Sequence, residues 1–198
     1  MGDIAGRTLG QRHGIRFKVA QVDVVAADVD LLVVGMFEDA AVNRPKGGAN
    51  QLDKVLHGTL RRLREGGIFK GVMGETLMLS TPPAPIRARS LMLIGMGGSD
   101  SALHLSIGRL TELAMRTALR MDAHSAGCLL AWSERDIPPD RVEETAAGMM
   151  LGALRAIEEN AEGKRQLDMD WTFDIRNGDA ERTAAALGRA LLAPLRPI

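Results

Sequence analysis

Two glycine-rich segments contain the residue types that bind phosphate groups through backbone amides. Gly47 and Gly48 lie directly before a helical pattern. Gly97, Gly98 and Ser99 follow an apolar strand pattern and precede a second helix. Free N–H groups in such positions attract anions, so these five residues are the candidate anion-binding residues. The same glycines also suit tight turns and helix caps, and the sequence alone leaves both interpretations open.

The sequence offers no recognisable metal site or activated nucleophile. The spacing of the four histidines is not typical of metal ligands. They are His13, His57, His104 and His124. Cys128 lies inside an apolar strand pattern, which indicates a small buried residue rather than a nucleophile. No Gly-x-Ser-x-Gly elbow occurs. We therefore expect no catalytic residue, no metal ligand and no cofactor in this chain.

The candidate loops belong to a pattern typical of an α/β sheet. Residues 30–35 and 90–95 are apolar runs short enough to be strands buried on both faces. Between them, apolar residues at helical spacing predict one helix that ends at Gly66-Gly67, followed by a strand over residues 76–80. Alternating apolar residues predict a further strand over residues 15–19.

The second half of the chain alternates helices with strands. Strands are expected over residues 127–132 and 171–175, and the last helix over residues 181–192. In the long helix before residue 158, Gly148 and Gly152 lie one turn apart, which would let a second backbone approach closely.

Six strands and four helices in this order predict one three-layer α/β domain, in which helices cover both faces of a mixed, mostly parallel sheet. Residues 1–13 are polar and glycine-rich, and we expect them to form a flexible N-terminal arm. Residues 14–198 would then form the domain.

The ordered segments resemble the N-terminal domain of the leucyl (cytosol) aminopeptidases, peptidase family M17. The resemblance rests on a leucine-rich helix, the segment Gly67-Ile-Phe-Lys-Gly-Val-Met-Gly-Glu75, and the strand Leu91-Met-Leu-Ile-Gly-Met-Gly97. Val72 stands where many family members have lysine. The resemblance implies a macro-domain-like fold with a sheet of about six strands.

The resemblance also bears on activity. In this family the reaction uses two metal ions held by Asp, Glu and Lys residues of a C-terminal domain, which would begin near Leu192. The family's metal-binding signature is absent from this sequence. The resemblance therefore implies a stand-alone, non-catalytic homologue that acts as a binding, regulatory or assembly module, beside a separately encoded peptidase chain. The alternative is a macro-like binder or hydrolase of a phosphorylated nucleotide such as ADP-ribose.

Composition describes an ordinary globular chain. Of the 198 residues, 45% are hydrophobic and 25% charged, and the formal net charge is +0, so nothing general attracts the chain to nucleic acid or to anionic membranes. One cysteine excludes an intrachain disulfide, as is usual in a reducing cytoplasm. No apolar run approaches the ~18 residues of a membrane helix. The expected location is the cytoplasm, without a membrane partner.

A protein is the expected partner. Some bacterial members of the resembled family bind DNA, but acidic residues balance the basic residues at 61–64 and 87–89, and the few aromatic residues lie in strand patterns. Residues 149–151 and 191–192 supply methionine and leucine side chains for an exposed apolar face. A symmetric homodimer, the commonest closed assembly, is the expected form.

Overall fold

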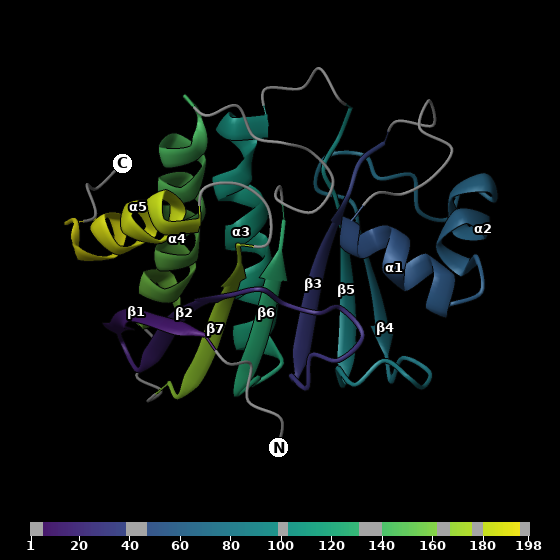
Figure 1. The fold of residues 1–198 in the computed structure, drawn as a ribbon, viewed down its shortest axis with the longest axis horizontal. Helices are drawn as coiled ribbons and strands as arrows, with labels where there is room; N and C mark the ends of the chain where they lie inside the picture. The colour runs from purple at the N-terminus through teal and green to yellow at the C-terminus, as the bar shows by residue number, and fades with distance from the viewer. Residues whose placement is uncertain are drawn as a thin grey trace.

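A computed structural model describes residues 6–38, 47–98, 103–130, 140–161, 167–175 and 180–194. In this part of the chain, one seven-stranded sheet lies between two groups of helices (Figure 1). The strands are β1 Arg7–Arg12, β2 Ile15–Ala20, β3 Leu31–Met36, β4 Thr76–Ser80, β5 Ser90–Gly95, β6 Ser125–Leu129 and β7 Met169–Asp174. The helices are α1 Gly47–Val55, α2 Thr59–Glu65, α3 Leu103–Arg120, α4 Val142–Ala161 and α5 Ala180–Leu192.

The sheet is mixed, as predicted, with the strand order β1-β2-β7-β6-β3-β5-β4. The five inner strands are parallel, and the edge strands β1 and β4 are antiparallel to their neighbours. Val33 of β3 lies opposite Met92 of β5 and Cys128 of β6. Because helices cover both faces, β3 and β5 are buried on both sides and read as nearly continuous apolar runs, whereas β2 alternates between apolar and charged residues.

The seventh strand corrects the prediction for the N-terminus. Residues 1–13 were expected to be a flexible arm, but β1 pairs with β2 along its whole length. The chain turns between the two strands at His13 (φ 49°) and Gly14 (φ 83°). Because β1 is polar and partly exposed, it lacks the apolar alternation that indicates a strand. Residues 1–5 lie outside the described part.

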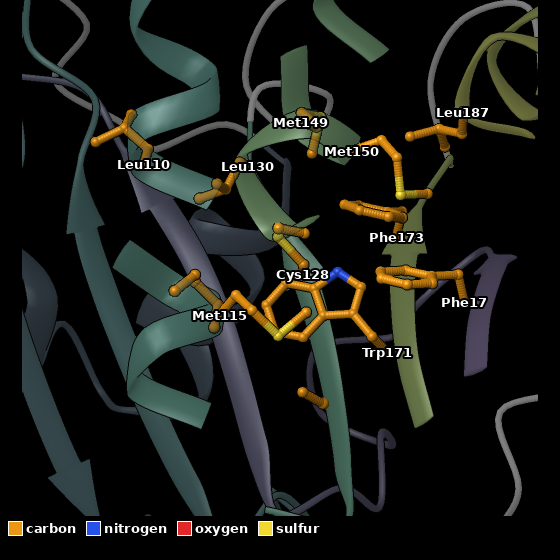
Figure 2. Packing of buried hydrophobic residues seen from close by; sticks show 14 of the residues in the cluster. Phe17, Leu110, Met115, Cys128, Leu130, Met149, Met150, Trp171, Phe173 and Leu187 are labelled. Atoms are coloured by element: carbon orange, nitrogen blue, oxygen red, sulfur yellow. The ribbon is translucent and has the colours of Figure 1, made fainter. Parts of the chain in front are cut away.

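Two apolar clusters form the core, one on each face of the sheet. Helices α3, α4 and α5 pack on one face, and α1, α2 and the segment before β3 pack on the other. In the larger cluster, Phe17 stacks on Phe173 at a centroid distance of 6.3 Å, and Trp171 meets Phe173 edge-on at 6.0 Å (Figure 2). Cys128 is fully buried beside them, as predicted.

Helices α3 and α4 cross at glycines, which confirms the prediction for Gly148 and Gly152. A Cβ atom added at Gly152 would lie 1.9 Å from the carbonyl oxygen of Gly108 in α3, and one added at Gly108 would lie 3.0 Å from that of Gly148. Only glycine permits backbones to approach this closely.

The first predicted helix is divided into α1 and α2. The break lies at His57 (φ 52°) and Gly58 (φ 76°), where positive φ angles end one helix before the next begins. Helix α2 ends before Gly66-Gly67, as predicted. Strand β6 begins two residues earlier than predicted, at Ser125, and residues 131–139 lie outside the described part.

Most of the apolar face expected at residues 149–151 and 191–192 is buried within the fold. Met149 and Met150 are fully buried, and Leu191 is buried between α5 and the core. Leu192 alone among these residues is exposed, at 86%. For residues 149 and 150 the prediction was wrong because α4 packs against α3, α5 and the sheet and is therefore apolar around most of its circumference. No described helix is long and apolar enough to cross a bilayer.

Candidate functional site

A ligand is expected at the end of the sheet that is formed by the carboxyl ends of the parallel strands. The chain leaves β3 for helices on one face, and it leaves β5 and β6 for helices on the other. In open α/β sheets, ligands bind where the connections diverge in this way. Strand β3 lies at this switch point, between β5 and β6.

The first pair of candidate residues lies inside a helix rather than in a loop before it. Gly47 and Gly48 are the first two residues of α1, and Gly48 is buried. The helix begins earlier than its apolar stripe suggests, because glycine carries no side chain that would reveal the periodicity. A helix N-terminus retains free amides, so the pair remains a predicted anion site.

The second group of candidates is partly used by the fold. The Gly97 N–H donates to the carbonyl oxygen of Gly71 at 2.9 Å, and the Gly97 carbonyl accepts from the Glu38 amide at 3.0 Å. A Cβ atom at Gly98 would meet no neighbour within 4 Å. Ser99 lies outside the described part. The Gly97 amide is therefore already engaged within the protein.

Backbone amides do form an anion-binding site at this end of the sheet, and the carboxylate of Glu75 occupies it. Glu75 Oε2 accepts hydrogen bonds from three consecutive amides, Lys70 N at 2.8 Å, Gly71 N at 2.7 Å and Val72 N at 3.2 Å. Successive amides that converge on one oxygen form an anion-binding nest. Charge-assisted bonds of this kind are stronger than neutral ones.

The glycines of this segment allow it to cross the end of β5. A Cβ atom at Gly95 would lie 1.9 Å from the carbonyl oxygen of Val72, and one at Gly71 would lie 2.8 Å from that of Phe37. Gly74 N donates to Gly95 O at 2.9 Å. The segment between Gly67 and Glu75, together with Gly95 and Gly97, therefore forms one interlocked turn, which we call the glycine clasp.

Arg64, which was not among the predicted residues, reaches this end of the sheet from α2. Its Nη2 donates to the Phe37 carbonyl just after β3. Its Nε is buried without a hydrogen-bond partner, and Arg64 forms no ion pair with another described residue. Within the basic cluster at residues 61–64, Arg61 and Arg62 are exposed, whereas Arg64 is partly buried.

A shallow cavity of about 90 Å³ lies at the other end of the strands, where β6 and β7 begin. Asp122, His124 and Asp168 contribute its polar lining. A cavity this small is well below the size of a typical ligand pocket. Among the described residues, no group of three His, Cys, Asp or Glu side chains is placed to hold a metal ion.

The environment of Cys128 does not suit a nucleophile. Burial raises the pKa of its thiol well above the usual range, although a hydrogen bond with the Leu130 backbone opposes this. The thiolate is the reactive form, so a buried thiol with a raised pKa is inert.

Comparison with known proteins identifies the family of this chain. The sequence profile of the cytosol aminopeptidase family, N-terminal domain, matches residues 33–166. A probable cytosol aminopeptidase of Alkaliphilus oremlandii is 27% identical over 139 residues, which are 70% of this chain and 27% of that protein. This chain spans about a quarter of the length of the curated relatives it matches.

Solved structures agree on the fold. A mutant of tomato leucine aminopeptidase matches with a TM-score of 0.64 at 23% identity, over 91% of this chain and 37% of that one. A Trypanosoma brucei macrodomain in complex with ADP-ribose matches with a TM-score of 0.61 at 15% identity, over 94% of this chain and 74% of that one. Since the family profile covers more than half of the sequence, the chain belongs to the cytosol aminopeptidase family through that family's N-terminal domain, whose fold here is macrodomain-like.

Proposed function

We propose that this chain is a non-catalytic binding, regulatory or assembly module that works in the cytoplasm, beside a peptidase chain encoded separately. The observation that carries the proposal is the glycine clasp. Its family-typical residues bind one another, and their polar groups are directed into the fold rather than toward a substrate.

Glu75 makes this point most clearly. A carboxylate that acts as a general base or metal ligand must present an oxygen to the reacting group. The Oε2 atom of Glu75 instead accepts three amides of its own turn. Its function is therefore to hold the clasp, and through the clasp to hold the ends of β3 and β5.

Peptidase assays test the proposal directly. The purified chain, supplied with manganese, zinc or cobalt, is expected to release no product from a leucine anilide. Turnover that survives repurification and is abolished by a chelator would contradict a non-catalytic role.

A second experiment tests the partner. Co-expression with an aminopeptidase catalytic chain from the same genome is expected to yield a complex that elutes together on gel filtration. A mixture that elutes as two separate species would contradict the separately encoded peptidase as the partner.

The alternative, a nucleotide-binding role, is supported by the macrodomain-like fold and by the ADP-ribose named for the T. brucei protein. Saturating ADP-ribose, at a hundred times its dissociation constant, would stabilise a binder by about 2.7 kcal/mol. This corresponds to a melting shift of several degrees for a domain of this size. Because the Gly97 amide already donates to Gly71, we expect no shift. A shift that Gly98→Val abolishes would favour the nucleotide role.

A further inference from the structure

Strand β4 lies at the edge of the sheet, and β5 is the one strand of the described part that pairs with it (Figure 1). Hydrogen bonds at both of its ends show which residues direct their backbone N–H and C=O groups toward β5. Gly95 N donates to Glu75 O at 2.7 Å, and Thr81 N donates to Arg89 O at 3.0 Å. In an antiparallel pair the bonded positions alternate. Residues 75, 77, 79 and 81 therefore face β5, and the intervening residues direct their amide and carbonyl groups away from the sheet.

The three outward positions are Thr76, Met78 and Ser80, and the side chains of all three are exposed. No backbone hydrogen bond joins them to another described segment. This edge thus presents three N–H and three C=O groups in the spacing that another strand requires.

The devices that normally keep an edge strand unpaired do not occur in β4. The five residues Thr76–Ser80 include no charged residue, no proline and no glycine. Their register with β5 is regular, without a bulge. Protected edges use such charges, prolines or bulges to prevent pairing between chains. Unprotected edges invite it.

Exposed apolar side chains occur in β4 and in the segment that leads into it. Ile68, Val72 and Met78 are three of the five large apolar residues exposed in the described part, at 65%, 43% and 37%. All three belong to β4 or to the segment that leads into it. An unprotected edge strand that also carries an exposed apolar side chain, Met78, favours pairing with another chain.

We propose that β4 pairs with β4 of a second copy of this chain, antiparallel about a twofold axis at Met78. The strand reads polar-apolar-apolar-apolar-polar from either end, so it is complementary to itself. Met78 then lies opposite Met78 of the partner subunit, and Thr76 lies opposite Ser80 of the partner subunit. Leu77 lies opposite Leu79 of the partner subunit on the other face. An isologous contact of this type closes after two chains.

The β4 pairing specifies the assembly role proposed above and rests on it. Separate experiments can contradict the pairing and the assembly role. Peptidase turnover would contradict the assembly role without changing the mass of the protein. A monomeric mass would contradict the pairing without producing turnover.

Light scattering with matched variants tests the pairing. At micromolar concentration the wild type is expected at twice its 21.3 kDa. Met78→Lys places two like charges opposite each other at the axis, which disfavours the pair, so its dissociation constant should rise at least tenfold. Met121→Lys is the control, because Met121 is exposed to a similar extent, 40% against 37%, at the end of α3. A wild type that stays at 21.3 kDa across a hundredfold dilution would overturn the proposal, as would a Met78→Lys variant as dimeric as the wild type.

A crosslink tests the register. Directly opposed residues in a bonded antiparallel pair have Cα atoms ~5.5 Å apart, within the range that a disulfide spans. Cys128 is the only natural cysteine and is buried, so Met78→Cys adds a single reactive thiol. Mild oxidation should give a covalent dimer for Met78→Cys and not for the control Met121→Cys. Equal crosslinking of both variants, or of neither, would contradict the Met78 axis.

Discussion

Strands β1 and β4 both lie at an edge of the sheet and both have one antiparallel neighbour, but their surroundings differ. The register of β1 shifts between Thr8 and Gly10. Arg7 pairs with Glu181 at 2.9 Å, and Arg12 pairs with Glu158 at 3.0 Å. Bulges and charges of this kind keep an edge from pairing with another chain. Strand β4 has neither, so one sheet carries a protected edge and an unprotected one.

Helix packing strengthens the difference. A Cβ atom at Gly10 of β1 would lie 2.9 Å from Cδ2 of Leu191, so α5 packs directly over this edge. Arg12 also reaches the carbonyl oxygens at the end of α5. Strand β4 is held by its pairing with β5, by the glycine clasp before it and by the bond from Thr81 after it. The β4 edge therefore depends on backbone geometry, whereas the β1 edge depends on side chains.

The largest expected effect comes from Gly95→Ala, which breaks the clasp that holds β4. The added methyl would lie 1.9 Å from the Val72 carbonyl oxygen, so the crossing segment must move. Overpacking against well-packed neighbours costs about 1–3 kcal/mol and occasionally more, and here the obstacle is backbone, so we expect at least about 3 kcal/mol. Urea denaturation measures the loss.

Gly98→Ala is the control for this change, since its methyl would meet nothing within 4 Å. It should alter the free energy of unfolding by less than about 0.5 kcal/mol, as is usual for a substitution away from packed features. Equal losses for the two variants would show that the close crossing at Gly95 does not determine stability.

Glu75→Gln should have the next largest effect. The neutral amide oxygen replaces a carboxylate that accepts three N–H groups. Hydrogen bonds to charged groups contribute about 1.5–3 kcal/mol, and part of each bond survives with glutamine, so we expect a loss of about 1–2 kcal/mol. Denaturation of Glu65→Gln, on exposed helix α2, serves as the matched measurement and should show almost no loss. A Glu75→Gln variant as stable as the wild type would contradict the anchoring role of the carboxylate.

These two edges also show how far the sequence could predict the fold. Strand β4 was predicted, although not its place at the edge, because its apolar residues and the apolar run of β5 identify strands locally. Strand β1 was not, since its residues are mainly polar and its pairing with β2 is a tertiary effect that propensity does not encode. The break between α1 and α2 was missed for a related reason. Leu56 and Leu60 are both buried on either side of it, so the apolar spacing continues across the break.

The site was harder to predict than the fold. Of the clasp residues, the sequence singled out only Gly97, as suited to a tight turn or to an anion site, and its φ of 73° is one that glycine favours. What spacing cannot show is which amides remain free. The Gly97 N–H is engaged by Gly71, and the nest at residues 70–72 is filled by Glu75. Both contacts depend on segments that only the folded chain brings together.

The β1 side of the sheet should respond to acid, in contrast to the uncharged β4 edge. Burial of Asp170 in β7 opposes its ionisation, but hydrogen bonds from Lys18 at 2.7 Å and Arg16 at 2.5 Å outweigh this and lower its pKa. A lowered pKa stabilises the fold above the unfolded value of about 3.9. That stability is lost as the pH falls through the lower folded value.

Asp170→Asn should therefore flatten the acid limb of the stability curve below about pH 4. Water reaches this group, so the loss at neutral pH should be no more than about 1 kcal/mol. Denaturation at a series of pH values measures it, with Asp140→Asn at an exposed ion pair as the control. An unchanged acid limb in Asp170→Asn would mean that these ion pairs do not stabilise the β1 side.

The smallest expected effect concerns the stability of the single chain in Met78→Lys. Below the concentration at which chains associate, this substitution should change the free energy of unfolding by less than about 0.5 kcal/mol, because the side chain is exposed and lies outside both core clusters. Leu77→Lys is the matched comparison one residue away. Leu77 packs against the cluster under α1 and α2, so a lysine there should cost more than about 1 kcal/mol. If Met78→Lys destabilised the single chain as much as Leu77→Lys, Met78 would serve the fold itself. The unprotected edge would then be part of the core, and its apolar character would no longer indicate a partner.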